Sequence, residues 1–483
     1  MATKKFYLTT PIYYPNDIPH LGHAYTTIAA DALARWHRLL GNKVFFLTGT
    51  DEHGKKIART AEKVGKTPEQ FTDALVPEFK KAWHTLNITY DRFIRTTEED
   101  HKKVVQYILE KVNANNDIYK GMYEGLYCTE CEAYYTEKDV PTAHCPIHKK
   151  PLETLKEESY FFRLSKYQPF LLDFYKKNPE FISPKKRKQE IINRVKEGLR
   201  DFSISRTSFS WGIPLPFDKK HITYVWFDAL INYLSGVDIL KNKKQFSTFW
   251  PADVHLIGKD ILWFHVVYWP AMLKSAGIEL PKKVFAHGFL TLHNEKIGKS
   301  AGNAITIQTL INYAGVDTAR YFLLRSTPFG EDGDFSEHAL KERHNNELAN
   351  KLGNLVTRTT ALAERYGIEK TLIKRLSSKQ LYTKITNYLK NLEFDKALNE
   401  IFSFIDRCNK FIQTKKPWET KDKEVLYELC NALKDIAILL SPFLPETSEK
   451  IATILNTPIT LKNLKKPLLI NKIKKSEILF KKI

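Results

Sequence analysis

The sequence predicts an α/β protein in which a parallel sheet is interrupted by an insert and followed by an all-α region. Three observations lead to this fold class. The N-terminal segment alternates strand-like and helix-like stretches, a pair of Cys/His motifs interrupts the middle of the chain, and helical periodicity dominates from about Glu342 onward. With 483 residues, of which 43% are hydrophobic, the chain is long enough for two or three packed domains.

The N-terminal segment has the pattern of one βαβ unit. Residues 6–13 are typical of a strand, residues 20–40 carry apolar side chains at helical spacing, and residues 44–47 are a short apolar run between turn signals. This order predicts a Rossmann-type parallel sheet, which binds ligands at the carboxyl ends of its strands. The runs 222–225 and 254–257 are further core-strand candidates, so we expect the sheet to resume after the insert.

Composition limits the class of partner and the compartment. The 75 Lys and Arg residues exceed the 55 Asp and Glu residues, and a net charge of +20 favours a nucleic acid partner, with a merely solvated basic surface as the alternative. The chain runs from its first residues into a strand without a targeting segment, and no uncharged stretch reaches membrane-spanning length. We therefore expect a cytoplasmic protein without membrane contact, whose cysteines are metal ligands or buried thiols.

His20 and His23 flank Gly22 at the predicted passage from the first strand to the helix. Helix N-terminal amides favour phosphate, histidines can donate to phosphate oxygens, and a glycine lets a flat base approach the backbone. The alternative is a structural turn in which the histidines cap the helix or pack. The motif predicts a nucleotide site without a Walker loop.

A second candidate phosphate motif lies far downstream, where Lys296 and Lys299 bracket Gly298 and are followed by Ser300. Two ammonium groups on a glycine-containing loop suit the charge that develops on a leaving pyrophosphate. In isolation such a string is most often a flexible basic loop. Together with the histidine motif, it predicts ATP-dependent activation of a substrate.

The insert carries the spacing of a metal site. Cys128 and Cys131 are separated by two residues, thirteen residues follow, and Cys145 and His148 are again separated by two. Four protein ligands of these types suit a closed, tetrahedral, structural Zn²⁺ site, and chance clustering of buried thiols is the alternative. The other two cysteines, Cys408 and Cys430, fall in predicted helices and are expected to be buried.

The helical region offers one recognition face. Asn350, Asn354 and Arg358 recur every four residues, so they share one side of a helix, where amide and guanidinium groups can contact base edges. Pro417 predicts a helix start that leaves Trp418 available for stacking on a base. A solvated helix face and a core tryptophan are the respective alternatives.

The last residues, 461–483, contain eight lysines and one glutamate. This tail could contact the phosphates of a nucleic acid partner, and a solvated amphipathic last helix is the other expectation.

The two motifs resemble the signature sequences of the class I aminoacyl-tRNA synthetases. Ile297 and Gly298 depart from the usual methionine and serine, whereas both lysines and Ser300 match. Within the class the resemblance is to the methionyl-tRNA synthetase family and extends over essentially the whole chain. Matching stretches are Thr10–Tyr14, Thr48–Gly54, Val225–Leu230, Ile257–Asp260 and His287–Thr291.

The resemblance implies a reaction and its participants. L-methionine and ATP would give methionyl-adenylate and pyrophosphate, with Mg²⁺ accompanying the ATP, and the methionyl group would then pass to the 3′ end of tRNA(Met). The expected catalytic residues are His20, His23, Lys296 and Lys299. The ATP site would add Gly22, Gly258, Asp260 and Ser300. The methionine site would be Ile12, Tyr14, Asp51, Trp226, Leu230, Tyr233 and His287. The anticodon CAU would be read by Asn354, Arg358 and Trp418, and Asn350 is less secure.

Side-chain chemistry makes these roles plausible. A carboxylate at Asp51 suits an α-ammonium group with three donors, and an aromatic pocket with a few polar tips suits a polarizable thioether. Core packing is the alternative for the pocket aromatics, and a tight turn is the alternative for Gly258 and Asp260.

The resemblance also implies a domain division and an oligomeric state. The expected division is 1–117, first half of the Rossmann catalytic domain; 118–218, connective insert with the zinc knuckle; 219–285, second half; 286–344, signature loop and linking domain; and 345–483, all-α anticodon-binding bundle. Some relatives append a C-terminal dimerisation barrel, and because this chain stops at Ile483 we expect a monomer.

Three other functions compete with this one. A sister class I synthetase for leucine, isoleucine or cysteine is the nearest, and the amino-acid dependence of activation separates it. A small-molecule nucleotidyltransferase would share the histidine motif and show no tRNA dependence. A zinc-containing RNA-binding protein that lost catalysis would bind no ATP.

Overall fold

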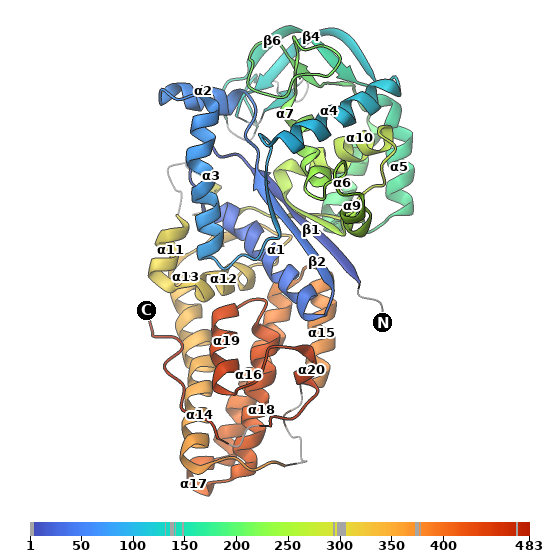
Figure 1. The fold of residues 1–483 in the computed structure, drawn as a ribbon. Helices are drawn as coiled ribbons and strands as arrows, with labels where there is room; N and C mark the ends of the chain where they lie inside the picture. Colours follow the sequence, from blue (N-terminus) through green and yellow to red (C-terminus); the bar gives the residue numbers. More distant parts are fainter. Residues whose placement is uncertain are drawn as a thin grey trace.

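In a computed structural model, the chain forms an α/β body with an insert above it and a helical bundle below it (Figure 1). The structure describes residues 4–130, 132–135, 140, 142–146, 149–292, 295–296, 306–371, 376, 378–469 and 472–483. No helix in these ranges is long and apolar enough to cross a membrane.

A parallel sheet forms the centre of the α/β body. Its described strands lie in the order β3 (Arg92–Arg95), β2 (Lys43–Thr50), β1 (Lys5–Tyr13), β11 (Val254–Gly258), β12 (Val284–His287) and β7 (Ile182–Ser183). All their pairings are parallel. The strand order reverses direction between β1 and β11, and a reversal of this kind creates a ligand-binding crevice at the carboxyl edge.

Helices cover both faces of this sheet. One face packs against α1 (Leu21–Leu39) and α3 (Pro68–Thr85), and the hydrophobic core there continues into the helical bundle. The other face packs against α4 (Glu99–Ala114), α5 (Gln168–Lys177), α6 (Lys185–Lys196), α7 (Val225–Leu230), α8 (Asn232–Ser235) and α10 (Trp269–Ser275). Additional helices are α2 (Lys55–Lys63) and α9 (Lys243–Phe249). Because both faces are covered, the central strands are apolar on both sides.

The insert forms its own antiparallel sheet. Its described strands lie in the order β5 (Ala133–Tyr135), β4 (Ile118–Cys128), β6 (Glu153–Phe162) and β8 (Phe202–Ser203). A further pair joins β9 (Ser205–Arg206) to β10 (Ile222–Thr223). Downstream of the central sheet, β13 (Leu290–Leu292) pairs with β14 (Glu295–Lys296) and β15 (Gly333–Phe335).

The C-terminal region is helical as predicted. After α11 (Ile307–Ala314), α12 (Val316–Arg325) and α13 (Glu337–Arg343), a π-helix (His344–Gly353) continues directly into α14 (Asn354–Tyr366). The bundle adds α15 (Lys379–Lys390), α16 (Phe394–Lys415), α17 (Pro417–Thr420), α18 (Lys423–Leu440), α19 (Pro445–Ile454) and α20 (Leu461–Leu464). In Figure 1, α17 lies at the end of the bundle farthest from the sheet.

Two expectations about the sheet are wrong. Residues 222–225 do not form a strand of the central sheet, because Ile222–Thr223 pairs antiparallel with β9 and α7 begins at Val225. All four side chains are buried, so the apolar run reflects burial and not strand membership. Conversely, β7 lies within the expected insert yet forms the edge of the central sheet, and two residues are too few to show a strand pattern.

The C-terminal tail is not an amphipathic helix. Beyond α20 the described residues form neither helix nor strand, and hydrogen bonds from Ser476 to Thr360 and between Lys481 and His344 place them along α14 and the π-helix before it. Leu468 and Ile473 are buried against the bundle, and Asn345 exchanges two hydrogen bonds with the backbone of Ile483, at 2.9 and 3.1 Å. Leu468 and Ile473 are therefore buried by packing against existing helices and not by forming a new one, whereas Leu469 and Ile478 stay exposed. Contact with tRNA stays a prediction.

Candidate active site

Several expected site residues meet at the carboxyl edge of the central sheet. Tyr14 follows β1, Asp51 follows β2, and Gly258 and His287 end β11 and β12. These strands are neighbours in the sheet, so residues far apart in the chain are brought to one crevice.

The histidine motif starts α1. His20 is the N-cap residue, its Nδ1 accepts from the backbone N–H of Gly22 at 3.1 Å, and Nδ1 of His23 accepts from the N–H of His20 at 3.2 Å. The two rings stack with centroids 3.9 Å apart. Because each Nδ1 accepts, each neutral ring carries its proton on Nε2, which can donate to a phosphate oxygen. The first turn of α1 contains no acidic residue that would oppose an anion.

Gly22 is required by the geometry of this cap. A Cβ at this position would lie 3.0 Å from Cε1 of His20. A larger side chain would therefore push on the His20 ring and disturb the donor that the cap orients.

The two ends of the lysine loop contact two of the stretches singled out in the sequence. Lys296 pairs with Thr291 in the sheet of β13 and β14, and Thr306 forms a backbone bridge with His20. Lys299 and Ser300 lie outside the described residues, and of Lys296 only the backbone is described. The bridge nevertheless returns the chain, directly after the loop, to the histidine motif.

Asp51 is a buried carboxylate next to other acids. It is 5% exposed, and neither its Oδ1 nor the buried hydroxyl of Tyr14 has a hydrogen-bond partner among the described residues. Burial raises the pKa of Asp51 well above its ordinary value, and the charges of Asp228, Glu132 and Glu52 raise it further. A cationic ligand group would satisfy both the charge and the open acceptor.

An aromatic wall lies on the same side of the sheet. The rings of Trp226 and Phe264 stack with centroids 3.8 Å apart, and the Tyr233 hydroxyl lies 2.7 Å from Nε2 of His265. Nδ1 of His265 donates to the carbonyl oxygen of Ile261, so Nε2 accepts from Tyr233. Burial lowers the pKa of His265 to about 4 and keeps the ring neutral.

Sequence reasoning missed Phe264 and His265. They belong to a π-helix, Phe264–Tyr268, that closely follows the Gly258–Asp260 stretch. Single π-helical turns occur often at functional sites. The available signal was the aromatic run directly after a recognised strand-end motif.

His287, which is also expected in the methionine site, has contacts with several elements. Its Nε2 lies 2.6 Å from Oγ1 of Thr26 in α1, its Nδ1 donates to the carbonyl of Gly288, and its ring contacts Tyr25 and Phe329. His287 pairs with Gly258 in the sheet, so the two residues end neighbouring strands. Leu230, the last residue of α7, is fully buried in the hydrophobic core. Ile12 is partly buried and packs against the same core.

Gly258 and Asp260 form a tight strand end. A Cβ on Gly258 would lie 2.7 Å from Oδ1 of Asp260, so a larger residue here would displace the Asp260 carboxylate. The neighbouring Lys259 is paired with Asp332 at 2.6 Å, and Asp260 itself is exposed at the crevice edge.

Two of the four expected metal ligands are described. Cys128 ends β4 and Cys145 begins the turn that leads to Pro151, and both side chains are buried. The hydroxyl of Tyr135 on β5 lies 3.8 Å from Sγ of Cys145, and Cys128 pairs with Ala133 on the same strand, so both thiols lie at one end of this sheet. Cys131 and His148 lie outside the described residues. Among the described residues no group of three or more metal-ligating side chains occurs.

The expected recognition face lies near the distal end of the bundle. The guanidinium carbon of Arg358 on α14 lies 4.2 Å from the ring centre of Trp418 on α17, and Asn354 is exposed one turn earlier. Asn350 is also exposed, but it belongs to the π-helix before α14. Arg358 and Trp418 therefore form one stacked, half-buried pair.

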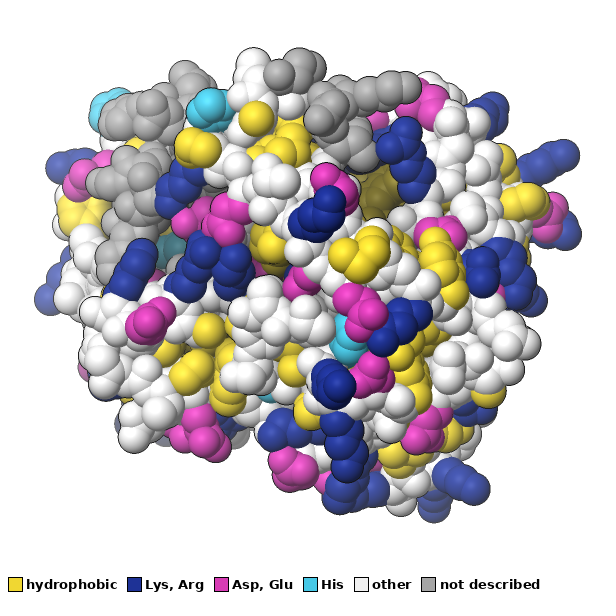
Figure 2. Space-filling model, turned by 90° about the horizontal axis from the view of Figure 1, so that it is seen from above, with side chains coloured by type: hydrophobic (Ala, Val, Ile, Leu, Met, Phe, Trp, Pro, Cys, Tyr) yellow, Lys and Arg dark blue, Asp and Glu magenta, His cyan; other side chains and the backbone are white. Residues whose placement is uncertain are grey.

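Charge on the face seen from above is mixed. Figure 2 shows lysine and arginine side chains distributed among acidic ones and hydrophobic ones, with no single basic patch in this view. The positive surplus of the sequence is therefore not gathered on this face.

The remaining cysteines behave as expected. Cys408 and Cys430 are fully buried in α16 and α18, and burial raises the pKa of both thiols, to about 12 for Cys408. Neither thiol is suited to act as a nucleophile.

Comparison with known families supports the site. Residues 6–154 and 138–360 match the family described as tRNA synthetases class I (M), and residues 369–481 match the anticodon-binding domain of tRNA ligase. The chain is 46% identical to a methionine-tRNA ligase of Caldanaerobacter subterraneus, over 99% of this chain and 79% of the relative. It is 45% identical to a methionine-tRNA ligase of Thermotoga maritima, over 92% of this chain and 74% of the relative.

Solved structures agree. Mycobacterium tuberculosis methionyl-tRNA synthetase in complex with methionyl-adenylate superposes with a TM-score of 0.93 at 38% identity, covering 98% of this chain and 99% of that one. The apo form of the Mycobacterium tuberculosis enzyme superposes with a TM-score of 0.87 at 35% identity, covering 100% and 98%.

Proposed function

Because the chain belongs to the methionine-tRNA ligases, which are class I aminoacyl-tRNA synthetases, we propose how its residues divide the reaction of that family. The enzyme joins L-methionine to tRNA(Met), with ATP as the second substrate, for initiation and elongation of translation. Methionine and ATP first give methionyl-adenylate and pyrophosphate, and the methionyl group then passes to the 3′ end of the tRNA.

Asp51 binds the α-ammonium group of methionine. Its buried Oδ1 without a protein partner supports this role, because a cation would remove the cost of the uncompensated carboxylate. The methionine side chain lies among the apolar and aromatic residues around it. These residues are Ile12, Tyr14, Trp226, Leu230 and Tyr233, to which we add Phe264 and His265 from their contacts with the last two aromatics.

The nucleotide lies on the α1 side of the crevice. Its proposed ligands are His20, Gly22, His23, Gly258, Asp260, Lys296, Lys299 and Ser300, whereas His287 stays with the methionine set. The backbone bridge between His20 and Thr306 supports joining the two motifs. Mg²⁺ bound with the ATP would neutralise phosphate charge.

Activation is then a matter of position and charge. A carboxylate oxygen of methionine attacks the α-phosphorus, the bond to the bridging oxygen of pyrophosphate breaks, and the Nε2–H groups of His20 and His23 donate to the phosphate oxygens as charge develops on them. In the second step a hydroxyl of the terminal ribose attacks the methionyl carbonyl carbon, and AMP leaves. Neither step requires a protein nucleophile.

Specificity follows from the shape of the pocket. A change of one methylene in an apolar pocket is worth about 1–3 kcal/mol. Discrimination against leucine and isoleucine therefore depends on the aromatic wall. The alternative of a sister synthetase for one of these amino acids is not needed to explain the pocket.

The observation that carries this function is the meeting of Tyr14, Asp51 and Gly258 at one edge of the sheet, beside the N-terminus of α1. Methionine-dependent exchange of pyrophosphate into ATP tests it, with leucine, isoleucine and cysteine as controls. Exchange with methionine alone supports the assignment. Equal exchange with a control amino acid, or none with methionine, would overturn it.

One structural Zn²⁺ is held by Cys128, Cys131, Cys145 and His148. The two buried thiols at one end of the insert sheet fit this ion, because thiolate and imidazole ligands in a closed set suit tetrahedral zinc. Metal analysis of the purified protein should give one zinc per chain, and Cys145→Ser should lower that content.

Asn354, Arg358 and Trp418 read the anticodon. The stacked guanidinium and indole present a flat surface for a base, and the neighbouring amide can contact base edges. We further propose that the protein works as a cytoplasmic monomer with the five-part domain division given above. Sedimentation analysis checks the oligomeric state.

A further inference from the structure

Asp228 lies between two histidines in the core of the α/β body. Nδ1 of His53 donates to its Oδ2 and Nε2 of His101 donates to its Oδ1, each at 2.7 Å. All three side chains are at most 3% exposed. Burial alone would raise the pKa of Asp228, but the charge and hydrogen bonds of the two histidines outweigh it and the pKa lies below its ordinary value.

The three residues come from three different elements. His53 stands two residues after Asp51 in the loop that follows β2, His101 belongs to the first turns of α4, and Asp228 follows Trp226 by two residues on α7. The hydrogen bonds therefore join the proposed ammonium-binding loop to the helix that carries the methionine pocket.

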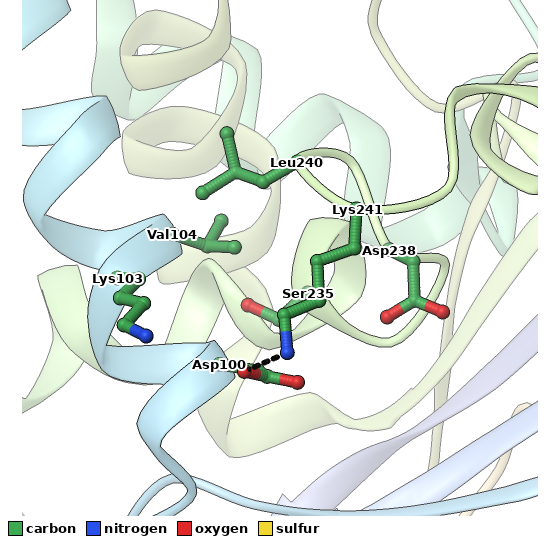
Figure 3. Close-up of a pocket in the computed structure, with 7 residues that line it drawn as sticks. All are labelled: Asp100, Lys103, Val104, Ser235, Asp238, Leu240 and Lys241. Carbon is green, nitrogen blue, oxygen red and sulfur yellow. Dashed lines mark ion pairs between the residues drawn. The ribbon is translucent and has the colours of Figure 1, made fainter.

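The network continues to the protein surface. Nδ1 of His101 lies 2.9 Å from Oγ of Ser235, which lines a small pocket between α4 and the loop after α8 (Figure 3). An ion pair of 2.5 Å between Asp100 and Lys241 crosses this pocket. Behind the pocket, the position of His101 is fixed from both sides, by Ser235 and by Asp228.

Each acidic neighbour of Asp51 has its own protein partners. Arg95 binds both oxygens of Glu52 at 2.8 Å, and Glu132 accepts from the N–H of Lys56 and from the Tyr127 hydroxyl. Asp228 has the two histidines. Asp51 differs from all three because its Oδ1 is buried without a partner among the described residues.

We propose that Asp228, held by His53 and His101, is a positioning residue for methionine: it fixes the Asp51 loop relative to Trp226. The sites for the ammonium group and for the thioether of methionine are then held at a fixed distance from each other. The proposal rests on the assignment of Asp51 to the ammonium group. A buried, fully hydrogen-bonded network favours one arrangement of the elements it joins. An apolar contact restricts that arrangement less, because it has no preferred direction.

Kinetics of pyrophosphate exchange test the proposal, with the KM for methionine and the KM for ATP measured separately. Asp228→Asn keeps the shape of the side chain but cannot accept from both histidines. We expect the methionine KM to rise about tenfold or more, the effect of an unpaired buried group, with the ATP KM changed by less than about twofold. An equal rise of both KM values would overturn the proposal.

A matched pair at His101 separates the hydrogen bond from the packing. In His101→Gln the side-chain amide can donate from nearly the position of Nε2, whereas His101→Leu fills the space without a donor. We expect the methionine KM of the glutamine variant to lie near the wild-type value and that of the leucine variant to match Asp228→Asn. Equal methionine KM values for the two variants would contradict the proposal. This pair also decides the matter if Asp228→Asn fails to fold.

Asp117→Asn is the control for loss of a buried carboxylate. Asp117 lies beyond the other end of α4 and accepts from Ser275 and Lys166, each at 2.7 Å. We expect this variant to lower the melting temperature and leave the methionine KM unchanged. If Asp228→Asn behaves in the same way, Asp228 is only structural.

Asp51→Asn distinguishes the two levels of the argument. A normal methionine KM in this variant would refute the ammonium assignment itself. A strong defect in Asp51→Asn together with normal kinetics in Asp228→Asn would refute the positioning role alone.

Discussion

The proposed methionine end and the proposed anticodon end of the molecule differ in how far their side chains are buried. Around Asp51 the polar side chains are buried, and the neighbouring acids are held by hydrogen bonds from other elements. Around Arg358 and Trp418 the side chains are half-buried, and a single stacked contact joins them. A small substrate must be enclosed and its charge matched, whereas a macromolecule needs an accessible surface. The chain therefore presents buried polar groups at one end and a partly exposed aromatic surface at the other.

The largest expected effect is at the enclosed end. If Asp51 binds the ammonium group of methionine as proposed, Asp51→Asn leaves that group buried without a partner, at a cost of about 3–5 kcal/mol. We expect kcat/KM for methionine in pyrophosphate exchange to fall by a factor between about 10² and 5 × 10³. A fall of less than tenfold would show that this end depends on enclosure and not on charge.

The same carboxylate predicts a pH dependence. The pKa of Asp51 is raised in the free protein, so the carboxylate becomes protonated on acidification at a higher pH than an ordinary aspartate. Methionine binding, which needs the charged form, should weaken as the pH falls through that raised value. Asp51→Asn should lack this dependence, which titration calorimetry at several pH values can measure.

The second effect concerns the junction between the two ends. Arg320 on α12 is fully buried and donates to Asp31 of α1 at 2.7 Å and to the carbonyls of Pro442 and Phe443 in the bundle, at 2.9 and 3.0 Å. Arg320→Met leaves the two bundle carbonyls without this donor and leaves Asp31 with Arg35 as its remaining cationic partner. We expect a loss of about 3 kcal/mol in stability, seen as a lower melting temperature.

Arg35→Met is the matched control for the junction. Arg35 also binds Asp31 at 2.7 Å but is partly exposed, so water can replace it. Its melting temperature should fall less than that of Arg320→Met. Equal losses would mean that the two ends are not held together by the buried arginine.

A smaller effect is expected at the accessible end. Trp418→Ala removes a stacking surface worth about 1–3 kcal/mol per base. The KM for tRNA(Met) in aminoacylation should rise about 10- to 100-fold, while pyrophosphate exchange without tRNA stays unchanged. Arg358→Lys, which keeps the charge but loses the planar group, should give part of this rise. A change in exchange would contradict the separation of the two ends.

The smallest effect tests how the insert is attached. Hydrogen bonds from Arg59, and further ones from Lys55 and Thr129, outweigh partial burial and lower the pKa of Glu153 from 4.5 to about 2. The stabilising contribution of this group is complete above about pH 4.5 and is lost as the pH falls toward 2. At neutral pH, Glu153→Gln should lose about 0–1 kcal/mol of stability, the range typical of a surface pair, and should melt slightly below the wild type. This difference should vanish near pH 2.

Glu124→Gln is the control on the same sheet. Glu124 pairs with Lys156 at 3.0 Å, and both side chains are about two-thirds exposed. Its melting temperature should follow the wild type at every pH. A loss as large as that of Glu153→Gln would show that the contacts to α2 contribute nothing specific.

Local patterns in the sequence were enough to predict the first βαβ unit, the helical C-terminal region and the two signature motifs. Strand alternation, helical spacing and caps depend on residues a few positions apart, and these are visible in one chain. The buried state of Cys408 and Cys430 also followed from residue type and position.

The tertiary structure alone decided which distant segments meet. It assigned β7 to the central sheet, removed residues 222–225 from it, and laid the C-terminal tail along α14. It also joined Phe264 to Trp226, and His53 to Asp228 and His101. These contacts link residues tens to hundreds of positions apart, and no local pattern specifies them, because their free energy is gained only when both elements are already folded and packed.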